Sequence, residues 1–518
     1  MGHSMVAGRR GARRALCLVV ALVAVVGVSA AGAAAGWLGV APLPTPRGLL
    51  AVAARDGVVY AAGGSSALGP SGLFEAYTAD TGTWSVLPPL PTPRNGLALV
   101  AARDGRIYAI GGNDGGFGAA RATVEAYSIA THSWTTMASL PAPRTGVSAV
   151  EGADGKIYVF GGQWQGDGGD YKNSVYAYDP STNSWATRNS SGFSARYYSA
   201  AARLPDGRIG VFGGWNNLLG GHLATAEAYD PASDTWSALP SMPTLRQGPA
   251  AFAGCDGRII VAGGADWSAQ LASADLYDPA SQAWSPGPTM LAAHAYAGVG
   301  VTIDGTATIV AGYTDPAGYL TSVERLDTSN GAWCGFDDGF ERGTLARWTE
   351  TRVSVQSATT LTGGYAATSA SSGRPSYART TLPSPRSDLY LRSWLRVASQ
   401  GPKPVTLLEL RTRGGELVSL IRRPDGTLAT RNAASDTTRT STTALPADDW
   451  HSLELHTRIG ATGQIDVWLD GIPITALTTR APLGTRPITT IGLGDTASGR
   501  RWNITYDDLA AAPNFLGQ

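Results

Sequence analysis

The feature that most constrains this 518-residue chain is a repeat of about fifty residues, which recurs six times between residues 37 and 334. Each copy carries an Asp-Gly pair, a Gly-Gly pair seven or eight residues later, and a closing tryptophan. The aspartates are Asp56, Asp104, Asp154, Asp206, Asp256 and Asp304; the glycine pairs begin at Gly63, Gly111, Gly161, Gly213 and Gly263, with Ala311-Gly312 in the sixth copy; the tryptophans are Trp84, Trp134, Trp185, Trp236, Trp284 and Trp333. Such a period predicts an architecture in which each copy is one supersecondary unit.

Each part of the repeat predicts a local structure. Asp-Gly between two apolar runs predicts a type I′ hairpin, in which both central residues need positive φ. The glycine pair predicts the end of a second strand, where neighbouring backbones approach too closely for side chains. The tryptophan is expected to bury its ring between adjacent sheets. Four short strands per copy, repeated radially, predict the blades of a propeller.

These residues resemble the kelch repeat, over about 300 residues, and the resemblance implies a six-bladed kelch β-propeller at residues 36–334. Two segments compete to complete the sixth blade. Trp37 precedes Arg47 by ten residues, as Trp84 precedes Arg94, which favours residues 36–43 as the closing strand. The alternative is that Trp333 supplies that strand.

Residues 1–35 have the organisation of a secretory signal peptide. Four arginines precede an uncharged apolar run, Ala15–Val28, and small residues follow it. The alternative is an uncleaved membrane anchor. We therefore expect a secreted, extracellular protein, or one held at the outer face of the membrane. The near absence of lysine indicates a GC-rich bacterial genome, and Cys255 and Cys334 either pair in that oxidising compartment or stay free.

The charge balance argues against one class of partner. After the leader, the chain has 36 basic and 40 acidic side chains. A nucleic-acid-binding protein is expected to present a basic face. We therefore expect no nucleic-acid partner, and we expect a monomer.

Residues 335–514 form a different domain, in which strand-like alternation replaces the fifty-residue period. The pattern predicts an antiparallel β-sandwich. Residues 336–348, 450–454, 467–471 and 506–509 resemble strands of concanavalin-like, laminin-G-like jelly rolls. The Glu-x-Asp-x-x-Glu motif of retaining glucanases does not occur in residues 335–518, so hydrolysis is not expected there. Asp337, Asp338 and Asp507 could hold a structural Ca²⁺ where the first and last strands pair, although ordinary strand-end carboxylates are the favoured interpretation.

A first set of candidate site residues recurs once per propeller blade. These are Arg47, Arg94, Arg144, Arg196, Arg246 and His294, and the acids Glu75, Glu125, Glu227, Asp275 and Glu324 recur in parallel. The cations either form a ring that attracts an anion or pair with the acids as structural salt bridges. Pairing is favoured, because unpaired neighbouring cations repel one another. Blade three has Tyr176 in place of the acid, which leaves Arg144 as the exception.

A second set is concentrated in the loops that follow the glycine pairs of blades three to five. The predicted ligand-binding residues are Trp164, Asp167, Tyr171, Tyr197, Trp215, Asn216 and Trp267, together with Arg144, Arg196 and His294. Aromatic faces with amide and carboxylate groups suit a neutral sugar. The alternative is that these tryptophans pack loops against neighbouring blades.

The leading hypothesis for function is non-catalytic binding of a carbohydrate or cell-surface glycan. One alternative is a sugar mutarotase or epimerase, since the chain is similar to exported six-bladed kelch sialic-acid mutarotases, whose ring-opening step needs only an acid/base pair. A second alternative is a scaffold for a protein partner at the cell surface. No catalytic residue is predicted, and no cofactor beyond the possible Ca²⁺.

Overall fold

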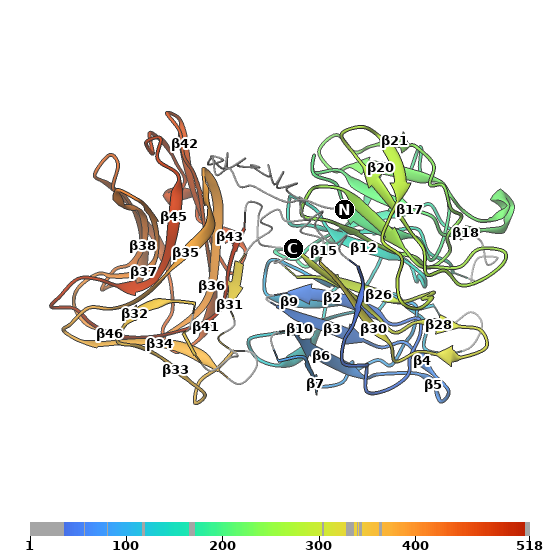
Figure 1. Ribbon diagram of the computed structural model, residues 1–518, viewed down its shortest axis with the longest axis horizontal. Helices are drawn as coiled ribbons and strands as arrows, with labels where there is room; N and C mark the ends of the chain where they lie inside the picture. The colour runs from blue at the N-terminus through green and yellow to red at the C-terminus, as the bar shows by residue number, and fades with distance from the viewer. Residues whose placement is uncertain are drawn as a thin grey trace, which may run out of the picture. The chain divides into compact units, whose positions relative to one another are not determined.

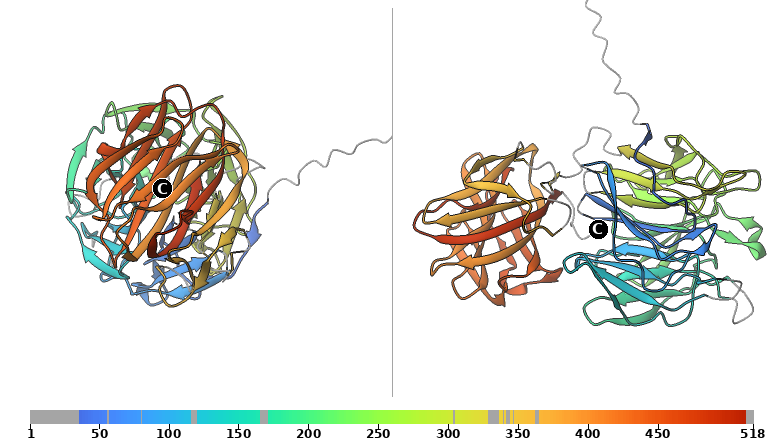
Figure 2. Two further views of the ribbon diagram at one scale, coloured as in Figure 1. Left: turned by 90° about the vertical axis from the view of Figure 1, so that its left-hand side faces the viewer. Right: turned by 90° about the horizontal axis from the view of Figure 1, so that it is seen from below.

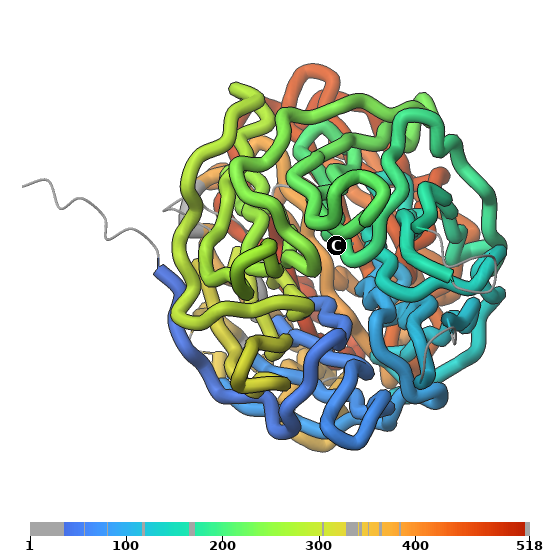
Figure 3. Tube along the Cα trace, turned by 90° about the vertical axis from the view of Figure 1, so that its right-hand side faces the viewer, coloured from blue at the N-terminus to red at the C-terminus, as the bar shows by residue number. Residues whose placement is uncertain are grey.

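The computed structural model describes residues 36–512, except for 56, 80, 116–119, 165–170, 303–304, 328–335, 339, 341–343, 346 and 362–364, and only the backbone at 336–338, 351 and 383–384. Within this part, residues 38–327 form six four-stranded antiparallel sheets, arranged around a common axis (Figures 1 and 3). This arrangement confirms the six-bladed propeller.

The strands of each blade follow the chain from the axis outward. Blade one contains β2 (Ala51–Arg55), β3 (Val58–Ala62), β6 (Phe74–Thr78) and β7 (Thr83–Val86); blade two contains β8 (Ala98–Ala101), β9 (Arg106–Ile110), β10 (Val124–Ser128) and β11 (Ser133–Thr136); blade three contains β12 (Ser148–Glu151), β13 (Ile157–Phe160), β14 (Val175–Asp179) and β15 (Ser184–Arg188). Blade four contains β16 (Ala200–Arg203), β17 (Ile209–Phe212), β20 (Ala226–Asp230) and β21 (Thr235–Leu239), and blade five contains β22 (Ala250–Ala253), β23 (Ile259–Ala262), β24 (Ala274–Asp278) and β25 (Ala283–Pro286).

Blade six joins the two ends of the propeller. Its strands are β26 (Gly298–Val301), β27 (Thr306–Val310), β30 (Val323–Asp327) and, at the outer edge, β1 (Leu38–Gly39). The pairing of Leu38 with Arg325 confirms that the N-terminal segment supplies the closing strand. Trp333, the alternative, lies outside the described residues.

The tryptophans link each blade to its neighbour. Each indole N–H donates to a backbone carbonyl of the adjoining blade, at N···O distances of 2.8–3.0 Å. The pairs are Trp37 with Pro288, Trp84 with Ala41, Trp134 with Pro88, Trp185 with Ala138, Trp236 with Asn189 and Trp284 with Pro240. Trp37 is 3% exposed and takes the same role in blade six that the other five take in theirs. The bonds therefore form a closed circuit.

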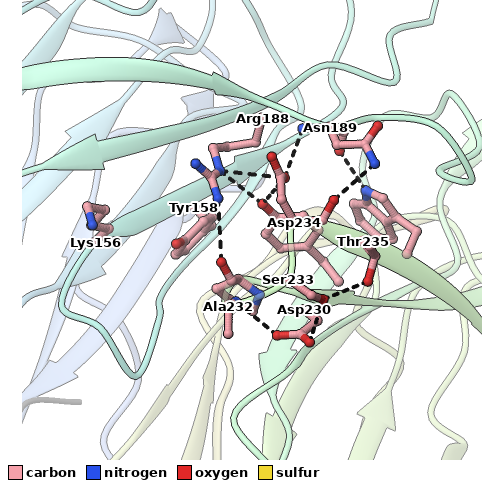
Figure 4. A network of polar contacts seen from close by, with 12 residues as sticks. Lys156, Tyr158, Arg188, Asn189, Asp230, Ala232, Ser233, Asp234 and Thr235 are labelled. Carbon is pink, nitrogen blue, oxygen red and sulfur yellow. Dashed lines mark hydrogen bonds and ion pairs between the residues drawn. The ribbon is translucent and has the colours of Figure 1, made fainter.

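At the seam between blades three and four, the Trp236 indole N–H donates to Asn189 O. A network of polar contacts surrounds this bond (Figure 4). Asn189 donates from its backbone N–H to Asp234 Oδ1 and from its side chain to Asp234 O, both at 3.0 Å. The Tyr229 hydroxyl donates to the same carboxylate at 2.6 Å and accepts a bond from Arg188. The outer turn of one blade is thereby fixed to the last strand of the other.

The glycine pairs lie where neighbouring backbones meet, as predicted. A Cβ on Gly63 would stand 2.4 Å from Arg94 O of the next blade, and the same holds for Gly161 and Arg196 O. The second residue of each pair then donates its N–H to that carbonyl, at 2.8–3.1 Å, in all six blades. The backbones at these two glycines therefore approach more closely than a Cβ normally allows, whereas blade six has Ala311 at this position, with a φ of 55°.

The predicted type I′ hairpin is wrong for the turns whose aspartate is described. Only the glycine has positive φ: Gly105 at 80°, Gly155 at 82°, Gly207 at 89° and Gly257 at 81°. In blade two, Gly105 N–H bonds to Ala102 O and the Asp104 carboxylate accepts the N–H of Arg106. This is the longer hairpin, a type I turn followed by a left-handed glycine. The aspartate therefore contributes a side-chain hydrogen bond to the turn and does not need a positive φ.

The C-terminal region contains two antiparallel sheets, seen as two layers in Figures 1 and 2. One holds β33 (Val353–Gln356), β34 (Ala366–Ser372), β46 (Arg501–Ala512), β36 (Asp388–Gln400), β41 (Trp450–Arg458), β42 (Gly463–Leu469) and β43 (Ile472–Pro473), with β31 (Phe336–Asp338) on β46 and β44 (Thr479–Ala481) on β42. The other holds β32 (Thr349–Thr351), β35 (Ser376–Arg386), β45 (Ile488–Asp495), β37 (Val405–Thr412), β38 (Gly415–Arg422), β39 (Thr427–Asn432) and β40 (Thr437–Ala444); a short 3₁₀ turn, η3, spans Thr475–Leu477.

A single apolar core joins these two sheets, with Leu391 and Leu395 of β36 and Leu408 and Leu410 of β37 all fully buried in it. The antiparallel sandwich is therefore confirmed, while its likeness to concanavalin-type jelly rolls stays a prediction. Trp394 and Leu361 of this region also join the core of blades one and two. Among the described residues, no helix is long and apolar enough to cross a membrane.

Candidate ligand-binding site

The recurring cations are structural, as the favoured interpretation predicted. Arg94 pairs with Glu125 at 2.5 Å, Arg196 with Glu227 at 2.5 Å, Arg246 with Asp275 at 3.0 Å and His294 with Glu324 at 3.0 Å, and Arg47 pairs with Glu75. Arg196 and His294 are at most 1% exposed. Burial lowers the pKa of Arg196, and the Glu227 carboxylate opposes this shift. These two predicted ligand-binding residues are thus engaged inside their blades.

Arg144 is the exception that the sequence indicated. It is 5% exposed, and it donates to Pro143 O at 2.7 Å and to the Tyr176 hydroxyl at 3.4 Å. Its guanidinium lies 6.0 Å from the centre of the Tyr176 ring, within range of a cation–π contact. Tyr176 therefore replaces the missing carboxylate, and Arg144 too is buried in its blade.

The loops after the second strands lie on one face of the propeller (Figure 3). In blade four this loop is a small hairpin, β18 (Trp215–Asn216) and β19 (Gly221–His222), joined by a 3₁₀ turn, η2 (Asn217–Leu219). Asn216 caps the turn by accepting the Leu218 N–H at 2.9 Å, and it donates to Ala195 O at 2.6 Å. Asn216 is 3% exposed. It shapes the loop from within, rather than presenting its amide on the surface.

Two rings of this hairpin, Trp215 and His222, pack against Trp267 from the corresponding loop of blade five. The Trp215 ring lies 5.4 Å from that of Trp267, and His222 packs edge-on against both, at 4.6 and 4.7 Å. Trp267 is 64% exposed, whereas Trp215 and His222 are half-buried. Burial lowers the pKa of the His222 imidazole, which favours its neutral form. We call Trp215, His222 and Trp267 the aromatic cluster.

Gly221 provides the surface on which Trp267 rests. A Cβ at this position would lie 2.4 Å from Cζ2 of Trp267, and Gly221 has a φ of 92°. The glycine is therefore required both by the hairpin and by the position of the exposed ring.

Tyrosines extend the aromatic cluster toward the propeller axis. Trp215 donates its indole N–H to the Tyr171 hydroxyl at 3.2 Å, and the rings of Tyr171 and Tyr197 lie 5.4 Å apart. Tyr197 packs in turn on Tyr198, and Tyr198 on Tyr296. A continuous row of rings thus runs from the exposed Trp267 to the axis.

At the axis, six residues with φ of 50–64° bind one another head to tail. Each N–H donates to the preceding member at 2.7–3.1 Å, and the circuit closes: Leu49, Gly96, Gly146, Tyr198, Gly248, Tyr296 and back to Leu49. The ring of Tyr198 lies against Gly146, where a Cβ would be 3.2 Å away. The glycines therefore leave room for the tyrosine rings at this end of the tunnel.

The other predicted site residues are placed as follows. Trp164 is half-buried at the end of the described part of its loop, and Asp167 lies outside the described residues. β31 pairs with β46, so the first and last sandwich strands do meet. Asp507 is fully buried and accepts the Leu361 N–H at 2.8 Å, while the side chains of Asp337 and Asp338 lie outside the described residues. Among the described residues, no group of three potential ligands is placed to hold a metal ion.

Two charged residues that line the tunnel were not predicted as site residues from the sequence. Glu151 and Arg203 end the inner strands β12 and β16, at a register where Ala101, Ala253 and Val301 stand in other blades. In the sequence, each of these charged residues interrupts a strand of small apolar residues, which could have marked it as unusual. A single strand gives no indication that both residues face the same axis, so their proximity could not be predicted.

Comparisons with known proteins address the repeat. Residues 106–293 match the model of the KLHDC2/KLHL20/DRC7 Kelch-repeats domain, and residues 46–91 match the Kelch motif. The propeller is a kelch propeller. A 71-residue stretch is 42% identical to an F-box/kelch-repeat protein of Arabidopsis thaliana, covering 13% of this chain and 14% of that protein.

A solved structure, that of YjhT, matches 55% of this chain and 95% of its own length, at 18% identity and a TM-score of 0.48. The ligand of the present propeller depends on its own surface residues.

Proposed function

We propose that this chain is an exported, non-catalytic glycan-binding protein, and that the glycan binds to the aromatic cluster on the loop face of the kelch propeller. The observation that carries the proposal is the 64% exposure of Trp267 beside Trp215 and His222. Sugar rings stack their C–H faces on such aromatic surfaces, while nearby polar groups accept their hydroxyl protons.

The polar groups next to the cluster suit a neutral ligand. Asp266 accepts from Ser268, and Tyr171 and Tyr197 in the row of rings each carry a hydroxyl. Two cations at the base of these loops, Arg144 and Arg196, are buried in their blades, while Lys172 follows Tyr171 in the loop of blade three. The Asp266 carboxylate, which precedes Trp267 in the chain, favours neutral sugars over acidic ones.

Two features support the proposal that the protein is exported: the leader and one cysteine. Cys255 is disulfide-bonded, and the other cysteines of the chain, Cys17 and Cys334, lie outside the described residues. Disulfides persist mainly in oxidising compartments. This bond is consistent with the expected secretory signal and with a location outside the cell or at its outer face.

The direct test is a glycan array probed with the full chain and with two variants of one residue. Trp267→Ala removes the stacking surface, and Trp267→Phe keeps a ring at the same place. We expect binding that is lost in Trp267→Ala and largely retained in Trp267→Phe. Gly221→Ala, which displaces Trp267, should also weaken binding. Equal signals from all variants would contradict the proposed site.

A protein partner is the second candidate. Leu218 and Leu219 of η2 are 79% and 55% exposed, and Leu68, at the tip of the β4–β5 hairpin (Ser65–Ser66 and Gly69–Pro70), is 98% exposed. Neighbouring exposed apolar side chains, as at Leu218 and Leu219, favour a protein contact. Leu218→Ser should abolish binding to a protein partner and leave a glycan signal unchanged.

A further inference from the structure

The axis of the kelch propeller contains a cavity of about 300 Å³. Its walls are the six inner strands, whose side chains there are mostly alanine, valine and leucine. An apolar cavity of about half this volume is large enough to bind benzene. The space can therefore accept a small, mostly apolar molecule.

One end of this cavity is charged. Arg203 lines it and is half-buried, and within the described residues no carboxylate lies within ion-pair distance of its guanidinium. Glu151 lines the same end and is 4% exposed; its Oε1 accepts the Arg103 N–H at 3.0 Å, while its Oε2 has no hydrogen-bond partner. A partly buried cation that makes no ion pair and a buried carboxyl oxygen without a hydrogen-bond partner are both costly.

The local charge balance indicates the kind of group that would relieve this cost. Arg103 and Arg55 act on the carboxyl of Glu151, and Arg55 is also influenced by Glu454. Burial raises the pKa of Glu151 to about 7, so a large part of this carboxyl is neutral at physiological pH. A ligand carboxylate would give Arg203 an ion-pair partner, and the neutral Glu151 carboxyl would donate a hydrogen bond to it.

The opposite end leads toward the loop face. A smaller space of about 100 Å³, lined by Tyr198 and Tyr296, shares Leu50, Leu97, Pro249 and Ala297 with the main cavity. The two spaces therefore adjoin.

We propose that the propeller tunnel is a binding site for a small apolar monocarboxylic acid, whose carboxylate pairs with Arg203 and hydrogen-bonds to Glu151 while its hydrocarbon part lies along the inner strands. This site is separate from the aromatic cluster, and it does not depend on glycan binding there. It explains why charged residues interrupt two inner strands at one register.

The test is calorimetric titration of the full chain with three probes of equal length: hexanoate, hexanol and hexylamine. Hexanoate should bind best, and at least tenfold more weakly in Arg203→Gln. Arg208→Gln is the matched control, because Arg208 lies on the same hairpin but pairs with Asp206 at the surface. This control should bind hexanoate like the parent chain, and thermal melts should show that both variants are folded.

Three results would overturn the proposal: no hexanoate binding to the parent chain, equal binding by Arg203→Gln, or tighter binding of hexylamine. If Arg203→Gln fails to fold, Ala201→Phe, which narrows the tunnel wall and leaves the charges in place, becomes the test variant. It should lower hexanoate affinity at least tenfold, and unchanged affinity would equally contradict a tunnel site.

Discussion

At the scale of single residues, the ion pairs of the propeller were predictable and the tunnel pair was not. Arg196 and Glu227 belong to a cation and an acid that recur at matching positions in five of the six copies, so their pairing follows from the repeat itself. Glu151 and Arg203 occur once each, and their proximity depends on how inner strands of different blades converge. Asn216 was predicted on the surface because its amide is polar, but capping of η2 uses that amide inside the loop.

Breaking one of the buried pairs should be costly. Glu227→Ala leaves the fully buried Arg196 without its counterion, which we expect to destabilise the chain by about 3–5 kcal/mol. Tyr176→Phe is the comparison, because Arg144 keeps its bond to Pro143 O and an aromatic face; its cost should be below about 1.5 kcal/mol. Urea unfolding of both variants measures the difference, and similar midpoints would show that the pairs contribute little.

Glu151 should make stability depend on pH. Its pKa is about 7 in the folded chain, chiefly because it is buried, against 4.5 in the reference state. Between these values the folded chain binds more protons than the unfolded chain, so this group destabilises the fold as pH rises, and the cost is complete above pH 7.

Glu151→Gln removes that titration while keeping an oxygen for the Arg103 N–H. The variant should match the parent near pH 4 and gain stability of roughly 2–3 kcal/mol by pH 8. Urea titrations at several pH values measure this difference. A difference that does not change with pH would contradict the assigned role of burial.

At the scale of elements, the strands and their order followed from the repeat, whereas turn type did not. Asp-Gly is compatible with two hairpins, and the bond from Arg106 N–H to the Asp104 carboxylate selects the longer one. The closing strand could be assigned to β1 because Trp37 keeps the spacing of the other copies. The axial circuit of left-handed residues was not foreseen, since Leu49, Tyr198 and Tyr296 are not residues that normally favour positive φ.

Closure of the propeller can be tested at Trp37. Trp37→Ala removes a ring that is 3% exposed and the bond to Pro288 O, which join blade six to blade five. We expect a loss of about 3–5 kcal/mol. Trp267→Ala, on an exposed ring, should cost less than about 1 kcal/mol. Equal thermal midpoints for these two variants would show that β1 does not close the propeller.

At the scale of the whole molecule, a kelch propeller and an antiparallel sandwich were both predictable, because repeat length and strand alternation are properties of long stretches of chain. The identity of the ligand could not be predicted in this way. It depends on a few loop side chains, above all Trp267, whose sequence context shows no repeat and whose exposure appears only in the folded chain.

The central claim is that the aromatic cluster binds a neutral glycan, and calorimetric titration of the strongest array ligand tests it most directly. The account predicts that Trp267→Ala weakens the affinity at least tenfold, while Leu218→Ser, on the neighbouring η2 turn, leaves it within twofold of the parent value. Unchanged affinity in Trp267→Ala, or a larger loss in Leu218→Ser, would contradict it.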